Sequence, residues 1–281
     1  MTFAIRHRTL RAGEVRLHCA EAGPEDGPLV LLLHGFPECW VTWKHQLPAL
    51  AAAGFHVVAP DLRGYGRSDR PEGIAEYRVE KLAADIGALI DALGSPSADV
   101  VGHDWGGLVG YHFAMWYPDK LRKLVVLNIP HPQRMARGLL SLRQLRMSWY
   151  AFFFLLPFLP ERGMAANHFR TLRSTFSKAL REPYDRETVD EILAGFSQPG
   201  ALTAALNYYR ALARPFGRRW ERIDKPVLVI WGEQDRHLGR ELAEPDPRWA
   251  SDVRVVRIAD AAHWVHADAR DRVNELLLHF L

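Results

Sequence analysis

Short apolar runs that alternate with helical patterns constrain the fold of this chain more than any other feature. The run Leu29–Leu33 contains only apolar residues and ends in His34-Gly35. A continuous apolar run of this length is typical of a strand buried on both faces, as in a parallel sheet. The expected strands are Arg6–Arg11, Val15–Glu21, Leu29–Leu33, His56–Ala59, Asp99–Gly102, Leu121–Leu127, Val227–Trp231 and Val253–Ile258. The expected helices are Cys39–Ala53, Val79–Leu93, Leu108–Trp116 and Asp268–Phe280. The alternation predicts a mostly parallel central sheet with helices on both faces, a fold of the α/β class.

The alternation is interrupted once, over residues 131–217, where the patterns are helical or irregular. The sequence therefore predicts an α/β core domain formed by residues 1–130 and 218–281. A helical cap of residues 131–217 would be inserted after the sixth strand. In open α/β sheets the ligand binds at the carboxyl ends of the strands, and a cap there would exclude water and shape a pocket.

Composition argues against several other classes of protein. The 36 basic and 33 acidic residues give a net charge of +3, and no block of Lys and Arg indicates a nucleic-acid partner. Cys19 and Cys39 are too few for a disulfide framework, and no Cys/His spacing predicts a metal site. The longest apolar stretch, Trp149–Leu159, contains Pro157 and is too short to span a bilayer. With no signal-peptide pattern in the first ten residues, we expect a soluble, cytoplasmic protein.

The segment Gly102-His103-Asp104-Trp105-Gly106-Gly107 has the pattern of a nucleophile elbow between a strand and a helix. Glycines allow the sharp turn and the close approach of the helix. The side chain at the centre, Asp104, would stand near the positive end of that helix, which favours an ionised carboxylate. A carboxylate can displace a leaving group from a saturated carbon and form an ester that water then hydrolyses. The alternative interpretation is an Asp that caps its own helix.

Partners for this nucleophile follow in the chain order of such sites, acid and then histidine. Asp235 follows the strand Val227–Trp231 and is the candidate acid, with Glu233 as a rival closer to the strand. His263 follows the last strand and is the candidate base that activates water. The backbone N–H groups of Trp105 and Phe36 are the candidates for the oxyanion hole.

With these motifs in place, the chain resembles the epoxide hydrolase branch of the α/β-hydrolase superfamily. The resemblance runs from about residue 5 to the end and is weakest over residues 131–200. It is carried by several motifs, namely His34-Gly35-Phe36-Pro37-Glu38, the loop Asp61–Ser68, the Asp104-Trp105 elbow, His263-Trp264 and Asn207-Tyr208-Tyr209-Arg210. The resemblance implies an α/β-hydrolase fold and hydrolysis of an epoxide to a vicinal diol without a cofactor. The aromatic residues of the cap suggest a fairly apolar pocket for a small-molecule substrate, and Phe36, Trp105 and Phe153 are the candidate substrate contacts.

Opening an epoxide produces an alkoxide, and the phenol of Tyr can donate the proton that it needs. The resemblance assigns this role to Tyr209 and implies a second Tyr from the first part of the cap. Phe153 stands at the expected position of that second Tyr, and Tyr150, one helical turn earlier, is the candidate substitute. Tyr208 is adjacent to Tyr209 and should point elsewhere.

Dehalogenases are the alternative, because haloalkane dehalogenases share an Asp-Trp elbow. Fluoroacetate dehalogenases share the His-Gly-Phe-Pro motif but carry Arg where this chain has Trp105. They also place the triad acid after the strand that ends here at Leu127, where this chain has Asn128, a turn residue or a pocket contact. A third hypothesis is a catalytically idle protein that only binds a ligand. The sequence leaves open the oligomeric state, with a homodimer as one option, and the identity of the epoxide.

Overall fold

The computed structural model describes residues 4–179, 184–214 and 217–281. Within these residues one eight-stranded sheet has the order β1-β2-β4-β3-β5-β6-β7-β8. The strands are β1 (Arg6–Ala12), β2 (Val15–Ala22), β3 (Leu29–Leu33), β4 (His56–Pro60), β5 (Ala98–His103), β6 (Leu121–Leu127), β7 (Val227–Gly232) and β8 (Val253–Ile258). β2 is antiparallel to β1 and β4, and the other neighbouring pairs are parallel. The prediction of a mostly parallel sheet is confirmed, and each strand lies within one residue of its expected bounds.

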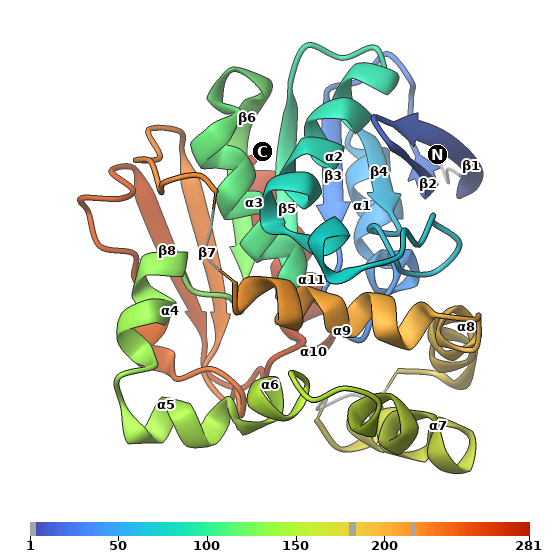
Figure 1. Cartoon of the computed structure of the whole chain (residues 1–281). Helices are drawn as coiled ribbons and strands as arrows, with labels where there is room; N and C mark the ends of the chain where they lie inside the picture. Colours follow the sequence, from blue (N-terminus) through green and yellow to red (C-terminus); the bar gives the residue numbers. More distant parts are fainter. Residues whose placement is uncertain (1–3, 180–183, 215–216) are drawn as a thin grey trace.

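Helices cover both faces of this sheet (Figure 1). The core helices are α1 (Gln46–Ala52), α2 (Val79–Ala92), α3 (Trp105–Trp116), α10 (Val265–Asp268) and α11 (Arg270–Phe280). Short 3-10 helices are η1 (Trp40–Trp43), η2 (Ile74–Tyr77), η3 (Pro118–Lys120) and η4 (Arg240–Leu242). Alternate residues of β3 supply two separate cores, with Leu31 and Leu33 on the α2/α3 side and Val30 and Leu32 on the α1/α11 side. Burial on both faces explains why this strand is apolar throughout.

Among the described residues, six helices between β6 and β7 form the predicted cap, which lies across the carboxyl ends of the parallel strands (Figure 1). They are α4 (Pro132–Gly138), α5 (Leu142–Met147), α6 (Trp149–Phe153), α7 (Leu159–Ala179), α8 (Arg186–Phe196) and α9 (Ala201–Leu212). The position of the cap after the sixth strand is confirmed, whereas the exact domain bounds remain a prediction. In the described part of the chain, no helix combines the length and apolar character that crossing a membrane requires.

The expected helix over Cys39–Ala53 is wrong in extent. The segment forms η1 and, after a break, the shorter α1, which begins at Gln46. Pro48 explains this start, because a proline lacks an N–H and clashes with the preceding turn, so a helix accepts it only in its first turn. Conversely, α3 begins at Trp105, three residues before its expected start at Leu108. The elbow residue therefore stands directly at the beginning of that helix.

Candidate active site

Asp104 lies on a sharp turn between β5 and α3, where the sequence predicts a nucleophile elbow. Its φ of 48° and ψ of −118° lie outside the strand and right-handed helical regions. A Cβ at Gly102 would be 2.4 Å from the carbonyl oxygen of Gly106, and one at Gly106 would be 2.1 Å from that of Leu33. These positions therefore accept only glycine without a backbone shift, which explains the spacing of the motif.

The Asp104 carboxylate makes no capping hydrogen bond with α3, which argues against the helix-cap interpretation. Instead its Oδ1 accepts a hydrogen bond of 2.9 Å from the backbone N–H of Phe36, in the loop after β3. Trp105 is the first residue of α3, so its N–H has no partner within the helix. The two N–H groups expected to form the oxyanion hole thus belong to the two segments that adjoin this carboxylate.

His263 and Asp235 extend a chain of contacts from Asp104. His263 Nε2 lies 3.6 Å from Asp104 Oδ2, and His263 Nδ1 lies 2.7 Å from Asp235 Oδ2. Asp235 follows β7 and His263 follows β8, so the carboxyl ends of two adjacent strands bring them together. Glu233, the rival acid, instead forms an ion pair of 3.1 Å with Arg257. The structure therefore places Asp235, and not Glu233, against His263.

Asn128 is a turn residue with a φ of 45°, and its side chain contacts Asp235. Its Nδ2 donates to Asp235 Oδ2 at 2.7 Å, and its Oδ1 accepts from the N–H of Gly232 at 2.8 Å. The N–H groups of His237 and Leu238 donate to Asp235 Oδ1 at 2.7 and 3.0 Å. Asn128 therefore helps to hold the candidate acid in place, a role that the sequence did not reveal.

The three candidate triad residues shift one another's pKa values. Burial alone would raise the pKa of Asp104, but the hydrogen bond and charge of His263, followed by the charge of His103, lower it. Burial would also raise the pKa of Asp235, and the charge of His263 lowers it. Burial would lower the pKa of His263, but the charges of Asp235 and Asp104 raise it to about 10. At neutral pH the site therefore holds an imidazolium between two carboxylates.

Tyr209 and Tyr150, the candidate phenol donors, reach the same space from two cap helices. Tyr209 lies on α9 and Tyr150 on α6, and their ring centroids are 6.3 Å apart. Tyr209 packs edge-on against Trp105, with centroids 4.9 Å apart. Burial raises the pKa of both phenols, so both keep their protons at neutral pH. Tyr208 points elsewhere, as predicted, and its hydroxyl donates to the carbonyl oxygen of Arg63 at 2.7 Å.

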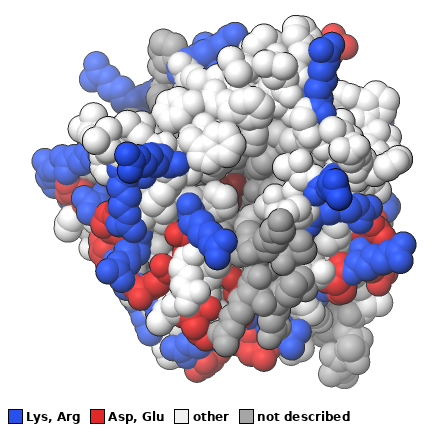
Figure 2. Space-filling model, turned by 90° about the horizontal axis from the view of Figure 1, so that it is seen from below, with Lys and Arg blue, Asp and Glu red and all other residues white. Residues whose placement is uncertain are grey.

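Two cavities meet at this point, and Asp104, Tyr150 and Tyr209 line both of them. The larger has a volume of about 720 Å³ and the smaller about 360 Å³. Other residues of the larger cavity include Phe36, Phe153 and His263, and those of the smaller include Trp105, Leu108 and Met135. Figure 2 views the molecule from the cap side and shows a hollow near the centre of this face, with an acidic side chain in its depth.

His237 also lines the larger cavity, although no motif in the sequence selects it. Its ring centroid lies 5.1 Å from that of His263 and 5.3 Å from that of Tyr150. Burial, followed by the charge of His263, lowers its pKa to about 4, so it is neutral at physiological pH. Its place two residues after Asp235 is the signal in the sequence that could have indicated a position in the site.

Comparison with known proteins agrees with this geometry. A family model described as alpha/beta hydrolase fold matches residues 28–269. The chain is 41% identical over 281 residues to the AB hydrolase superfamily protein YfhM of Bacillus subtilis, covering 99% of this chain and 98% of the relative. It is 36% identical to epoxide hydrolase 4 of Mus musculus, covering 95% of this chain and 76% of the relative.

Solved structures of epoxide hydrolases are also similar to this chain. The epoxide hydrolase of Bacillus megaterium, crystallised in complex with an inhibitor, superimposes with a TM-score of 0.88 at 30% identity, covering 97% of this chain and 99% of that one. Epoxide Hydrolase A of Mycobacterium thermoresistibile gives a TM-score of 0.84 at 30% identity, covering 99% and 98%. The chain therefore belongs to the α/β-hydrolase superfamily, within the branch that contains the epoxide hydrolases.

Proposed function

We propose that the protein is an epoxide hydrolase that converts an epoxide and water to a vicinal diol through an ester on Asp104. The observation that carries the proposal is the pair of phenols, Tyr150 and Tyr209, that line both cavities together with this carboxylate. An epoxide oxygen becomes an alkoxide when the ring opens and needs a proton, whereas a halide leaves as a stable anion. The similarity to epoxide hydrolases of mouse and Bacillus megaterium supports the same reaction.

In the first step, an Asp104 oxygen attacks one carbon of the epoxide. Oδ1 is engaged by the Phe36 N–H, which leaves Oδ2 for the attack. The new bond joins Oδ2 to carbon, and the bond between that carbon and the epoxide oxygen breaks. The epoxide oxygen keeps the electron pair and takes a proton from Tyr209 or Tyr150, which becomes a phenolate.

In the second step, water hydrolyses the ester. His263 first gives up its extra proton, which replaces the one lost by the phenol. Neutral His263 then takes a proton from water, and the hydroxide oxygen bonds to Cγ of Asp104. The negative charge develops on Oδ1, beside the N–H groups of Phe36 and Trp105. Collapse of this intermediate expels the diol, which takes the proton of the new carboxyl group and leaves Asp104 ionised.

The charges of the resting site support this order of events. Two carboxylates raise the pKa of His263 to about 10, so the free enzyme holds His263 protonated. Ester formation removes the charge of Asp104, and the pKa of His263 must then fall. His263 thus becomes a base when the ester exists, and Asp235 continues to orient it through their 2.7 Å contact.

The experiment that tests the proposed function is a mixed substrate panel. Purified protein is incubated with aryl and alkyl epoxides and, separately, with haloalkanes and haloacetates. Formation of a diol without halide release is the expected result. Release of halide without formation of a diol would indicate a dehalogenase, and no turnover of any substrate would indicate a protein that only binds a ligand.

A further inference from the structure

Large apolar side chains are exposed along one stretch of the cap. Eight of the ten such side chains that are exposed among the described residues lie within residues 140–159. These eight, which we call the apolar surface of the cap, are 40% to 86% exposed and comprise Leu140, Leu142, Trp149, Phe152, Leu155, Leu156, Phe158 and Leu159. A contiguous exposed apolar patch on a folded chain often marks a site of contact with a partner or a membrane.

The apolar surface lies on the outer side of the cap. It belongs to α5, α6, the start of α7 and the connections beside them, and Figure 1 places these helices on the side of the cap that faces away from the sheet. Figure 2, seen from that side, shows a broad area without charged side chains, with Lys and Arg side chains along its edges. An apolar area with a basic border is typical of surfaces that bind anionic membranes.

The same part of the chain is strongly basic. Residues 132–176 contain seven Arg and one acidic residue, Glu161, so their net charge is +6, whereas the net charge of the whole chain is +3. The rest of the chain is therefore net acidic. Glu161 forms an ion pair of 2.8 Å with Arg210, which lies outside this segment, so Glu161 does not neutralise any of the seven Arg. The positive charge is thus concentrated around the apolar surface.

Several of these Arg side chains are available to a partner. Three of the seven form ion pairs with carboxylates outside the segment. Arg146 on α5 and Arg162 and Arg170 on α7 are exposed and form no ion pair within the part of the chain that the structure describes. Arg146 precedes Trp149 by three residues, and Arg162 follows Phe158 by four. Unpaired cations therefore flank the exposed aromatic stretch at both ends.

The apolar surface continues into the cavities of the candidate active site. Trp149 is 64% exposed and also lines the larger cavity. Phe152 and Leu155 are exposed and also line the smaller cavity. Both cavities reach Asp104. Apolar side chains thus connect the outside of the cap with the candidate nucleophile.

We propose that the apolar surface of the cap docks on the surface of an anionic phospholipid bilayer, and that apolar epoxides enter the cavities from that bilayer. The Trp, Phe and Leu side chains enter the boundary between head groups and acyl chains, where such residues are stable. Arg146, Arg162 and Arg170 contact the lipid phosphates. The entry of an epoxide rests on the proposed function, whereas the docking can be measured without it.

A second copy of the chain fits this surface less well than a membrane does. A symmetric dimer brings the same patch of both subunits together, so it would place two segments of net charge +6 against each other. Like charges across an interface oppose association. A bilayer that contains anionic lipid carries the opposite charge and also offers an apolar layer to the exposed aromatic side chains. Charge complementarity therefore favours the membrane.

The first experiment measures binding of the full chain to vesicles by flotation. The vesicles contain either phosphatidylcholine alone or phosphatidylcholine with phosphatidylglycerol, and binding is measured at about 50 mM and about 500 mM NaCl. We expect binding to the vesicles with phosphatidylglycerol, weaker binding at the higher salt concentration, and little binding to phosphatidylcholine alone. No binding at the lower salt concentration, or equal binding to both kinds of vesicle, would overturn the proposal.

Two double variants separate the apolar from the charged contribution to this binding. Leu142→Ser/Phe158→Ser changes two side chains that are 77% and 72% exposed. It should weaken binding to the anionic vesicles by about tenfold or more, because both side chains would be buried in the membrane. Arg146→Gln/Arg162→Gln should weaken binding by about 30-fold, since each Arg near an anionic surface strengthens binding by about fivefold.

The matched controls make the same kinds of change on the core domain. Leu278→Ser replaces an exposed Leu of α11, and Arg254→Gln/Arg272→Gln removes two exposed charges from β8 and α11. Both controls should bind vesicles as the wild type does, and an equal loss of binding in them would refute the assignment to the cap. Light scattering gives the mass of each protein in solution. A wild-type dimer that becomes a monomer in Leu142→Ser/Phe158→Ser would assign the surface to a second copy and overturn the proposal.

The second experiment tests the entry of substrate from the bilayer. It compares diol formation from a long-chain epoxide held in anionic vesicles with diol formation from a small aryl epoxide dissolved in water. Among the described residues that line the two cavities at Asp104, neither Leu142 nor Phe158 occurs. In Leu142→Ser/Phe158→Ser the rate with the vesicle-held epoxide should therefore fall by about tenfold or more, and the rate with the dissolved epoxide should stay within about twofold.

An unchanged rate with the vesicle-held epoxide in this variant would refute entry from the bilayer. If the wild type turns over neither epoxide, the proposed function fails, and flotation still decides whether the cap binds the membrane.

Discussion

Replacing Tyr209 by Phe tests the proposed proton donor with little disturbance of packing. The ring stands edge-on to Phe36, Trp105 and Phe154, with centroid distances of 5.7, 4.9 and 5.0 Å, and Phe keeps these contacts. The hydroxyl is the group removed, and in the transition state it would donate to a developing alkoxide. A hydrogen bond to a charged group contributes about 1.5–3 kcal/mol. We therefore expect kcat/KM for an epoxide to fall by about 10- to 150-fold, with Tyr150 left as the second donor.

The matched control lies one residue away on the same helix. Tyr208→Phe also removes a buried phenol hydroxyl, but that hydroxyl bonds to the carbonyl oxygen of Arg63. It should cost about 1 kcal/mol of unfolding free energy and leave kcat/KM within about twofold. The assay is diol formation at substrate concentrations well below KM, beside urea unfolding of each variant. Wild-type turnover in Tyr209→Phe, or an equal loss in Tyr208→Phe, would refute the reasoning.

Three further predictions concern the nucleophile, the base and the elbow. In His263→Gln, ester hydrolysis should slow by about 100- to 10,000-fold and intact mass spectrometry should detect a substrate adduct on Asp104; rapid turnover without an adduct would contradict the covalent mechanism. The pKa of His263 is raised from 6.5 to about 10 in the folded protein, so its stabilising contribution is complete below pH 6.5 and is lost as the pH rises through 10. Urea unfolding at several pH values should therefore give a decline of at most about 5 kcal/mol over this range, and an equal decline in His263→Gln would exclude His263 as its source. Gly106→Ala should lower the unfolding free energy by about 3 kcal/mol or more, because its Cβ would lie 2.1 Å from a backbone oxygen. An unchanged melting temperature would disprove that the backbone leaves no room for a side chain at Gly106.

The strands could be predicted closely because burial on two faces imposes an apolar run that few other structures require. The elbow at Asp104 and the order of Asp235 and His263 also follow from local sequence, since each lies in the segment that follows a strand. The segment Cys39–Ala53 shows the limit, because its apolar pattern continues through a proline that restricts where a helix can begin. The catalytic roles of all these residues remain predictions that the experiments above test.

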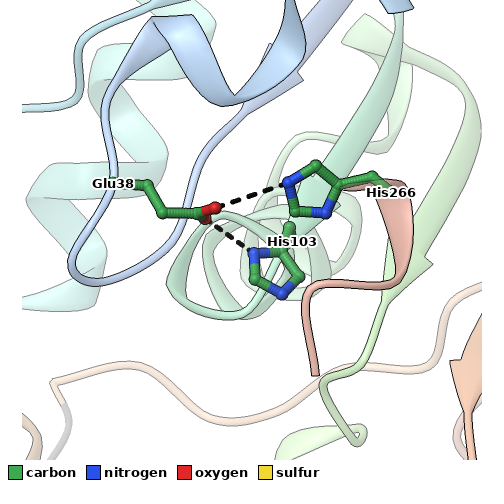
Figure 3. A group of neighbouring side chains, drawn as sticks. All are labelled: Glu38, His103 and His266. Carbon is green, nitrogen blue, oxygen red and sulfur yellow. Dashed lines mark hydrogen bonds and ion pairs between the residues drawn. The ribbon is translucent and has the colours of Figure 1, made fainter. Parts of the chain in front are cut away.

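Contacts in the site between residues far apart in the chain could not be predicted from the sequence as well as the strands could. Asn128 lies 107 residues from Asp235, and Glu38 lies 65 residues from His103, so no local pattern joins either pair. The family resemblance implies a second tyrosine near Phe153, and helical spacing then suggests Tyr150, which lies one turn earlier. Local patterns could not indicate that Glu38 (Figure 3) and the backbone oxygen of His263 contact His103, because both lie far from it in the chain.

The cap and the sheet contribute different halves of the proposed reaction. The carboxylate that makes the new bond is fixed to the sheet, whereas both phenols that receive the departing oxygen stand on helices of the insertion. A change of cap could therefore alter which leaving group is accepted without disturbing the elbow or its hydrogen bonds. The same division implies that motion of the insertion relative to the sheet would change the distance between the phenols and the Asp104 carboxylate. Proton donation and nucleophilic attack would then no longer occur on the same bound substrate.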